Sequence, residues 1–316
     1  MTVALLFSPQ GSQSVGMGRD LAEGIPAASA VFEMADEVLG WSVRELAWKG
    51  PAERLNETRW TQPALLTTSV AALAALRDRI DPAPAFVAGH SVGEYAALVA
   101  AGVLSFPDAL RLVARRGELM SQPSVEGGMA AVIGLDRSTV ADVIASVASP
   151  AELVVANDNA PGQVVISGTG AALANAEVAL RDAGARRVIS LPVSGPFHSG
   201  WMAEVCDDLA RAMEEADWHD ADPPMINNVT AEPVEHAATI QALLAEQVRS
   251  PVEWVASVRR MVADGVDTFI ECGPGAALTG MVRRIAPESR LLNVSDMQTL
   301  GDTVASVRAP AVGTPA

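Results

Sequence analysis

The sequence predicts an α/β protein whose large, hydrolase-like domain contains a parallel sheet and carries an inserted, ferredoxin-like small domain. Three observations support this prediction. The apolar run Phe86-Val-Ala88 meets Gly89-His-Ser-Val-Gly93 and then an Ala-rich segment, which is typical of a strand, a sharp turn and a helix. Other short apolar runs alternate with helical patterns. Between residues 128 and 193 the order becomes strand, helix, strand, strand, helix, strand.

Composition and charge narrow the class of protein. Of the 316 residues, 49% are hydrophobic, which is ample for a buried core. The formal net charge of −16 disfavours nucleic acids and anionic membranes as partners, because like charges repel. No apolar run approaches the roughly 20 residues that span a bilayer, and the start of the chain does not resemble a signal peptide. We therefore expect a cytoplasmic protein.

The first part of the chain alternates strand and helix. Val3 to Phe7 is predicted to form a buried strand, followed by a glycine-bearing loop that fits neither the phosphate-loop nor the dinucleotide pattern. Helical patterns cover residues 27–39, 43–48 and 61–79, and Pro63 suits the first turn of the third. Behind the Ser91 turn, Ser105 is expected to cap a helix that runs to about Met120.

The pattern changes near residue 128. Strands are expected at 129–134, 152–156, 164–167 and 187–191, helices at 138–148 and 171–182, and a hairpin turn at Asn159-Ala-Pro-Gly162. We expect residues 1–127 and 194–316 to form a discontinuous large domain and residues 128–193 the small domain. Ligands commonly bind in the cleft between two such domains.

The last third of the chain returns to the large domain. Helices are expected at 201–215, 240–248, 252–263 and 277–285, strands at 225–230 and 268–271, and a disordered tail after Arg308. Cys206 and Cys272 lie far apart without metal-ligand spacing, so we expect buried, reduced thiols and no metal site.

Ser91 is the candidate nucleophile. In a G-x-S-x-G turn the strained backbone pushes the hydroxyl outward, and the two glycines leave room for it. The helix that follows offers free N–H groups and its positive dipole end to negative charge that develops beside Ser91. The pattern alone leaves open a tight turn that happens to contain a serine.

A serine nucleophile needs a base, and the chain has four histidines. His90 adjoins Ser91 on the same turn, where its side chain should point away from the hydroxyl. His219 and His236 lie among acidic residues in polar segments, which favours solvated side chains. His198 lies in a turn where the chain leaves the small domain, so by elimination it is the candidate base.

Arginine pairs form the third feature. Arg116 lies at the centre of the apolar stripe of its helix, where a guanidinium is costly to desolvate and needs an anionic partner. The pattern leaves open whether that partner is a protein carboxylate or the carboxylate of a ligand. Arg115 with Arg116, and the pairs at 259–260 and 283–284, are islands of positive charge that can receive a phosphate or an acidic protein.

An α/β-hydrolase is the first alternative, because it shares G-x-S-x-G and orders its triad as serine, acid and histidine. No acid stands out in this chain, and no histidine follows His236, whereas hydrolases usually place that residue near the chain end. The ferredoxin-like insert is also foreign to that pattern.

The chain resembles the malonyl-CoA:acyl carrier protein transacylases of fatty acid synthesis and their stand-alone relatives that serve polyketide synthases. The match covers about residues 3–290. Its motifs, in order, are Gln10-Gly-Ser-Gln13, Thr61-Gln-Pro-Ala64, Gly89-His-Ser-Val-Gly-Glu94, Arg116-Gly117 with Leu119-Met120, Asn159-Ala-Pro-Gly-Gln-Val-Val-Ile-Ser-Gly168, Gly195-Pro-Phe-His-Ser199, Asn228-Val-Thr230 and Gly273-Pro-Gly275.

The resemblance implies a ping-pong transfer of a malonyl group through an acyl-Ser91 intermediate. His198 would serve as general base and later as acid, and Arg116 would bind the free malonate carboxylate. The family has no catalytic aspartate, and the backbone carbonyl of Gln247 would orient the histidine instead.

The resemblance also implies the oxyanion donors and the substrate contacts. The backbone N–H groups of Gln10 and Val92 would form the oxyanion hole. Phe197 favours malonyl over methylmalonyl, because relatives that take methylmalonyl usually carry a smaller residue there, and Val92 points the same way. Asn159 is expected to contact the substrate.

The resemblance further implies the partners. The acyl donor is a coenzyme A thioester, the acceptor is the phosphopantetheine thiol of an acyl carrier protein, and no metal or redox cofactor is needed. Because carrier proteins of this system are typically acidic, docking should use the local arginine islands. We expect a monomer.

Two positions depart from the family pattern. Ser8-Pro9 replaces the usual Pro-Gly and can shift the oxyanion loop, and Gly200-Trp201 replaces the usual Pro-Leu and can change the lining of the site. The alternatives are therefore a specialised acyltransferase that moves another acyl group onto, or between, polyketide carrier proteins, and an editing hydrolase. A non-catalytic module that binds carrier proteins is less expected, because Ser91, His198 and Arg116 are all present.

Overall fold

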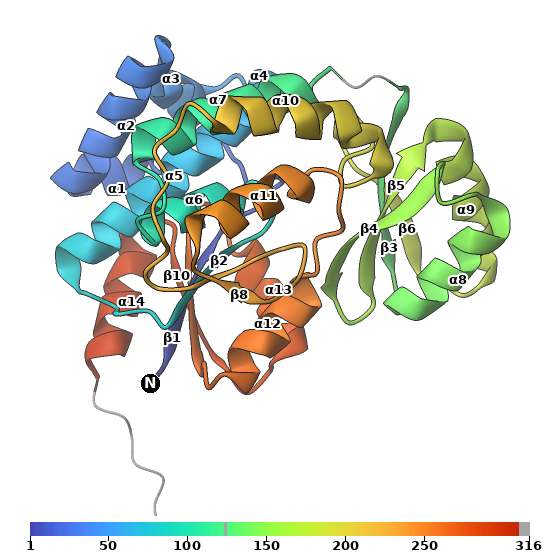
Figure 1. Cartoon of the computed structure of the whole chain (residues 1–316). Coiled ribbons are helices and arrows are strands. Elements are labelled where there is room, and N and C mark those ends of the chain that lie inside the picture. Colours follow the sequence, from blue (N-terminus) through green and yellow to red (C-terminus); the bar gives the residue numbers. More distant parts are fainter. Residues whose placement is uncertain (123–124, 310–316) are drawn as a thin grey trace, which may run out of the picture.

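The computed structural model describes residues 1–122 and 125–309, so the tail expected after Arg308 lies outside the described residues except for Ala309. Two sheets and their helices make up the fold (Figure 1). The strands are β1 (Val3–Phe7), β2 (Phe86–Gly89), β3 (Gly127–Ile133), β4 (Leu153–Ala160), β5 (Gln163–Thr169), β6 (Arg187–Ser190), β7 (Met225–Ile226), β8 (Pro233–Val234), β9 (Thr268–Cys272) and β10 (Arg290–Val294). The helices are α1 (Arg19–Gly24), α2 (Pro26–Leu39), α3 (Val43–Lys49), α4 (Ala52–Leu55), α5 (Thr58–Arg79), α6 (Gly93–Ala100), α7 (Phe106–Met120), α8 (Arg137–Val147), α9 (Gly170–Asp182), η1 (Gly200–Met202, a 3₁₀ turn), α10 (Ala203–Met213), α11 (Ala237–Gln247), α12 (Trp254–Ala263), α13 (Ala277–Ile285) and α14 (Met297–Arg308).

The large sheet has the order β10-β9-β1-β2-β7-β8, and all its pairings are parallel except that of β7 with β8. Its central strand β1 is buried at every residue, as expected of a parallel strand covered on both faces. Because side chains alternate along a strand, Leu5 and Phe7 enter the core with α2, α5 and α6, whereas Ala4 and Leu6 pack with α12 and α13. The sheet thus holds the carboxyl ends of β1 and β2 rigidly side by side.

The small sheet has the order β4-β5-β3-β6 with every pairing antiparallel, which is the strand order of the ferredoxin-like arrangement. Helices α8 and α9 lie on the side of this sheet that faces away from the large domain (Figure 1). In β3, Ala130 and Val132 pack beneath these helices, whereas Met129 joins the core of the large domain. Because the two sheets share no strand, we propose that residues 128–193 form the small domain.

A short segment ties the small sheet to the large domain. Val252 lies beside β4, where its N–H donates to the carbonyl of Ala156 at 2.8 Å and its carbonyl accepts from the N–H of Asp158 at 3.0 Å. The ion pair of Arg137 with Glu253 reinforces this junction. Residues 247–253 therefore belong to the boundary between the two sheets.

Three sequence-based expectations are corrected, and some elements of the fold were not expected from the sequence. Helix α5 begins at Thr58, three residues earlier than predicted, so Pro63 lies in its second turn. Asn159 lies on strand β4, and the turn consists of the two residues that follow Ala160. The strand predicted at 225–230 ends at Ile226, because the Asn227 side chain accepts hydrogen bonds from the N–H groups of Val229 and Thr230 and bends the chain. Strand β10 and helix α14 were not predicted.

None of the helices in residues 1–122 and 125–309 is long and apolar enough to cross a membrane. Both cysteines, Cys206 and Cys272, are buried and unbridged, as expected.

The turn between β2 and α6 requires glycine at two positions. A Cβ atom on Gly89 would lie 1.9 Å from the carbonyl carbon of Gly93, and a Cβ atom on Gly93 would lie 2.2 Å from the carbonyl oxygen of Phe7. Both neighbours are backbone atoms that cannot move aside. The two glycines therefore allow the start of α6 to pass directly over the end of β1.

We expect Gly93→Ala to lower the free energy of unfolding by at least about 3 kcal/mol, because the added methyl group collides with the backbone of β1. Gly301→Ala is the matched control, since Gly301 lies in α14 with open space around it, and should raise stability by about 0.5–1 kcal/mol. Urea denaturation followed by circular dichroism measures both. Equal stability of Gly93→Ala and wild type would contradict the steric argument.

Candidate active site

Ser91 lies at the turn between β2 and α6 in a left-handed backbone conformation, with φ of 53°. This conformation is strained for a residue with a side chain, so neighbours must hold it. Asn228 does so from the loop after β7. Its Oδ1 accepts from the N–H of Ser91 at 2.7 Å, and its Nδ2 donates to the carbonyl of Gly89 at 2.7 Å. The turn is thus closed by one buried amide.

Ser91 and His198 form the hydrogen-bonded pair that the sequence predicted. The distance from Ser91 Oγ to His198 Nε2 is 2.8 Å. On the other side of the ring, Nδ1 lies 2.9 Å from the carbonyl oxygen of Gln247 and 3.1 Å from that of Ser250. Since carbonyls only accept, Nδ1 carries the proton and Nε2 accepts the hydrogen bond of the hydroxyl. This tautomer can take the proton of Ser91.

The environment keeps His198 neutral. Its side chain is buried, and burial together with the positive charge of Arg116 lowers the pKa of His198 to about 3. An imidazole with so low a pKa is unprotonated at neutral pH. His198 is therefore ready to accept a proton before any ligand arrives.

Arg116 brings a buried positive charge to the same place. Its side chain is 1% exposed, and Nη2 donates to Ser91 Oγ at 3.0 Å and to Gln247 Oε1 at 3.0 Å, while Nη1 donates to Gln62 Oε1 at 2.9 Å. Within the described part of the chain, these partners are neutral and Nε has none. Desolvation by burial lowers the pKa of Arg116. Among the described residues, the guanidinium therefore has no hydrogen bond or ion pair with a carboxylate, and the buried carboxyl of Glu94 acts on it only through its electric field.

The side chain of Gln247 and the carboxyl of Glu94 extend the hydrogen bonds around Arg116. Neither group was expected from the sequence to have a role. Gln247 Nε2 donates to the carbonyl oxygen of Ser91 at 3.0 Å and to Glu94 Oε2. Glu94 Oε1 accepts from the N–H of Asn228 at 2.7 Å. Burial raises the pKa of Glu94 to about 8. The signal available in the sequence was an acid directly after G-x-S-x-G in an otherwise apolar helix.

The backbone N–H groups of Gln10 and Val92 are available as donors. In residues 1–122 and 125–309 the structure gives neither of them an acceptor. Val92 precedes α6, so its N–H belongs to the positive end of that helix. The side chain of Gln10 is held by Thr58 Oγ1, which accepts from its Nε2 at 3.2 Å. Val92 directly follows Ser91 in the chain, and Gln10 lines the same cavity as Ser91.

A cavity of about 180 Å³ opens over Ser91 and His198 between the two sheets. Phe197 and Asn159, which are expected from the sequence to contact the substrate, both line it. Asn159 Oδ1 accepts from His90 Nε2 at 2.7 Å, so the ring of His90 is held by Asn159. The lining residues are Pro9, Gln10, Gly11, Gln13, His90, Ser91, Arg116, Met120, Met129, Asn157, Asn159, Val165, Leu191, Pro192, Val193, Phe197, His198 and Met281. Residues from both sheets thus enclose a polar floor with apolar walls.

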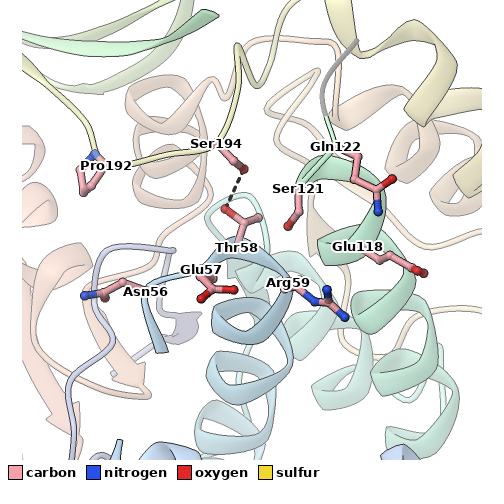
Figure 2. A pocket seen from close by; sticks show the side chains of 9 residues that line it. All are labelled: Asn56, Glu57, Thr58, Arg59, Glu118, Ser121, Gln122, Pro192 and Ser194. Atoms are coloured by element: carbon pink, nitrogen blue, oxygen red, sulfur yellow. Dashed lines mark hydrogen bonds between the residues drawn. The ribbon is translucent and has the colours of Figure 1, made fainter. Parts of the chain in front are cut away.

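A second cavity of about 280 Å³ lies beside the start of α5 and the end of α7 (Figure 2). Pro192 lines both cavities. Thr58 Oγ1 accepts from Ser194 Oγ at 3.3 Å, the dashed contact in Figure 2, and also holds Gln10. The Thr58–Ser194 contact therefore links the chain that leaves the small domain to the loop that carries Gln10.

Two further sequence-based expectations concern the departures from the family pattern and the two polar histidines. Pro9 lines the cavity over Ser91, so the departure at Ser8-Pro9 touches it, whereas Gly200 and Trp201 are not among its lining residues. His219 and His236 lie elsewhere on the surface, with side chains 63% and 83% exposed, as expected.

The chain is similar to characterised proteins over most of its length. A family model described as "Acyl transferase domain" matches residues 4–306. The malonyl CoA-acyl carrier protein transacylase of Bacillus subtilis (strain 168) is 44% identical over 301 residues, covering 94% of this chain and 95% of that protein. The enzyme of the same name from Escherichia coli (strain K12) is 43% identical over 284 residues, covering 89% and 92%.

Solved structures agree with these relatives. The acyl-carrier-protein S-malonyltransferase of Burkholderia pseudomallei 1710b superposes with a TM-score of 0.93 at 38% identity, covering 96% of this chain and 100% of that one. A malonyl-transacylase in complex with a type II PKS acyl-carrier protein also gives 0.93 at 38% identity, covering 97% and 100%.

We expect Ser91 to react with phenylmethanesulfonyl fluoride, an uncharged reagent, at a rate that stays constant from pH 8 down to about pH 5. The pKa of His198 is lowered to about 3, so protonation removes the base only in strong acid. Intact-protein mass spectrometry of sampled reactions measures the rate. In Arg116→Met the loss of a neighbouring positive charge should raise the pKa of His198 and move the acid limb upward. A wild-type rate that halves near pH 6.5, the ordinary pKa of histidine, would contradict the assigned environment.

Proposed function

The chain belongs to the acyl transferase domain family, and we propose that it moves a malonyl group from malonyl-CoA to the phosphopantetheine thiol of an acyl carrier protein. One observation carries the choice of acyl group: a buried guanidinium, that of Arg116, donates directly to the hydroxyl of Ser91. The names of relatives that are 40–44% identical over most of the chain support the same reaction.

In the first half-reaction, His198 Nε2 takes the proton of Ser91 as Oγ attacks the thioester carbonyl. The carbonyl oxygen becomes an oxyanion, which the N–H groups of Gln10 and Val92 stabilise, and removal of one such donor typically costs about 10²- to 10³-fold in rate. When the C–S bond breaks, the imidazolium returns its proton to the departing CoA sulfur. The products are malonyl-Ser91 and free CoA.

In the second half-reaction, the phosphopantetheine thiol of the carrier protein gives its proton to His198 and attacks the ester of malonyl-Ser91. Breakdown of the tetrahedral intermediate releases Ser91 Oγ, which regains the proton from the imidazolium. The carbonyls of Gln247 and Ser250 orient the ring in both halves. Apolar walls, such as Met120 and Met129, keep water from competing with the thiol.

Selectivity follows from the charge of Arg116. The free carboxylate of a malonyl group can pair with the guanidinium, whereas an acetyl group would leave that buried charge without an anion. Phe197 is 4% exposed, adjoins His198 and lines the cavity, and its ring leaves less room for an α-methyl branch than a smaller side chain would. These two features together favour malonyl over acetyl and methylmalonyl groups.

The reaction as proposed needs no metal or redox cofactor, because Ser91, His198 and two backbone N–H groups supply nucleophile, base and oxyanion donors. We place the protein in the cytoplasm as a monomer. Its buried, unbridged cysteines are compatible with a reducing compartment.

For the carrier protein, the surface around α13 is the proposed docking region. Met281 lines the cavity over Ser91, and Arg283 and Arg284 follow it on the same helix with exposed side chains. Arg284 also donates to Gln163 Oε1 at 2.8 Å, which ties α13 to the small sheet. A positive edge beside the cavity can attract an acidic carrier even though the whole chain is acidic.

Brief incubation with malonyl-CoA should give wild-type protein a malonyl adduct that intact-protein mass spectrometry detects. Ser91→Ala should form none, and Arg116→Ala should form it at least about tenfold more slowly, because the malonate carboxylate loses its cationic partner. Acetyl-CoA and methylmalonyl-CoA should label wild type weakly. His219→Ala, whose side chain is 63% exposed, is the control and should label normally.

If none of the three thioesters modifies wild type, the malonyl assignment fails, and a larger acyl group delivered by a carrier protein becomes the leading idea. Release of free malonate at equal rates with and without carrier protein would indicate a hydrolase instead of a transferase.

We expect Arg283→Glu to raise the KM for the carrier protein several-fold, with the malonyl-CoA half-reaction unchanged, because the new carboxylate repels an acidic partner. Arg79→Glu is the matched charge reversal, since Arg79 lies about 33 Å from the active-site end of the 22-residue helix α5. Steady-state kinetics at several salt concentrations measures the effect. Equal KM values for the two variants would exclude this docking surface.

A further inference from the structure

Two buried side chains of opposite charge flank the Ser91 turn. Arg116 is on α7 and Glu94 is on α6, and they are 1% and 0% exposed. They do not touch. The side-chain amide of Gln247 lies between them, accepting from Arg116 Nη2 at 3.0 Å and donating to Glu94 Oε2. A single amide therefore joins the two charges.

The two charges fix the direction of that amide. Its oxygen must face the guanidinium, which only donates, and its nitrogen must face a group that accepts. The groups that point at Glu94 are donors: Gln247 Nε2, the N–H of Asn228 at 2.7 Å and Asn227 Nδ2 at 3.4 Å. Burial raises the pKa of Glu94 to about 8, whereas the hydrogen bonds from Asn228 and Gln247 and the charge of Arg116 lower it. Because Gln247, Asn228 and Asn227 all donate to its two oxygens, the hydrogen bonds fit the ionised carboxylate, and we assign that form.

We propose that Glu94 is a positioning residue for acyl-group selectivity: through the amide of Gln247 it holds the Arg116 guanidinium in the orientation that receives the acyl carboxylate beside Ser91. This inference rests on the proposed malonyl transfer and deepens it. Gln62 holds the other terminal nitrogen of Arg116 at 2.9 Å, so the guanidinium plane is fixed at two points. The Nη2 group that Gln247 holds is the one that donates to Ser91 Oγ.

An amide at position 94 would disturb this arrangement in a definite way. In Glu94→Gln the new side chain can still offer its oxygen to the N–H of Asn228, which turns its NH₂ group toward Gln247 Nε2. Two donors then face each other, and of the two acceptors of Gln247 Nε2 only the carbonyl of Ser91 remains. The Gln247 amide is then no longer fixed in direction and can rotate. Rotation brings its NH₂ group against Arg116 Nη2, and the guanidinium loses the acceptor that orients it.

A purely structural role for Glu94 predicts a different outcome. Glu94 contacts Asn228, which closes the Ser91 turn, so a loosened turn would slow acylation by every thioester alike. A positioning role acts through Arg116 and affects only acyl groups that carry a carboxylate. The ratio of acylation efficiencies with malonyl-CoA and acetyl-CoA separates the two roles.

The experiment measures single-turnover acylation of Ser91 by both thioesters, with quenched samples read by intact mass. For Glu94→Gln we expect the malonyl-to-acetyl ratio of kcat/KM to fall about tenfold, chiefly through a higher KM for malonyl-CoA, while acetylation changes little. Gln247→Met keeps the backbone carbonyl that orients His198 but removes the amide, so it should lower the same ratio. In an Arg116→Met background, Glu94→Gln should change the ratio no further.

Glu271→Gln is the control for loss of a buried carboxylate. Glu271 is also 0% exposed, and its oxygens accept from the N–H groups of Leu278 and Thr279 at the start of α13, away from Arg116. It should destabilise the fold and leave the ratio unchanged.

The inference is overturned if wild type prefers malonyl and folded Glu94→Gln and Gln247→Met slow both thioesters equally or neither. It is also overturned if Glu94→Gln lowers the ratio equally in the Arg116→Met background. A wild type without preference for malonyl removes the proposed function itself and this inference with it, and that result is visible before any variant is made.

Discussion

The burial of Arg116 beside a serine hydroxyl is the constraint to which the rest of the site is fitted. A desolvated guanidinium is costly, and in the described residues this one has only amides and a hydroxyl as direct partners. Two glutamine side chains accept hydrogen bonds from the guanidinium without neutralising it, so its charge remains available to an incoming carboxylate. The same charge lowers the pKa of His198, which keeps the base unprotonated. In the proposed reaction, one buried cation thus binds the carboxylate of the acyl group and also keeps the base unprotonated.

The fold holds this charge in place by bringing distant segments to one sheet edge. Strands β1 and β2 end side by side, and the backbone of α6 crosses them at distances that only glycine allows at positions 89 and 93. The catalytic histidine, like Ser91, has positive φ, 57° against 53°, so both reacting groups sit on strained backbone. Neighbours supply the restraint: Asn228 closes the turn at Ser91, and the N–H of His198 donates to the carbonyl of Val248 at 2.9 Å.

The sequence predicted those parts of the site that depend on local pattern. These parts are the G-x-S-x-G turn, the apolar stripe that buries Arg116 and the helix cap at Ser105. Each depends on residues close together in the chain, and the structure confirms all three. An acid directly after G-x-S-x-G marks Glu94 as unusual, but the sequence does not identify its partner, because the Gln247 side chain lies 153 positions away in the chain. Strand β10 was missed for a related reason: its residues are mostly half-buried at the sheet edge, so the apolar signal is weak.

The segment at 247–253 connects the small sheet to the groups that hold His198. Gln247 and Ser250 supply the carbonyls that orient His198, and two residues later Val252 pairs with β4 of the small sheet. The neighbouring residues of β4, Asn157 and Asn159, line the cavity from above. A shift of the small sheet would therefore move the roof of the cavity and the carbonyls behind His198 together. The insert thus covers the cavity over Ser91 and, through this shared segment, is coupled to the position of His198, the base in the proposed reaction.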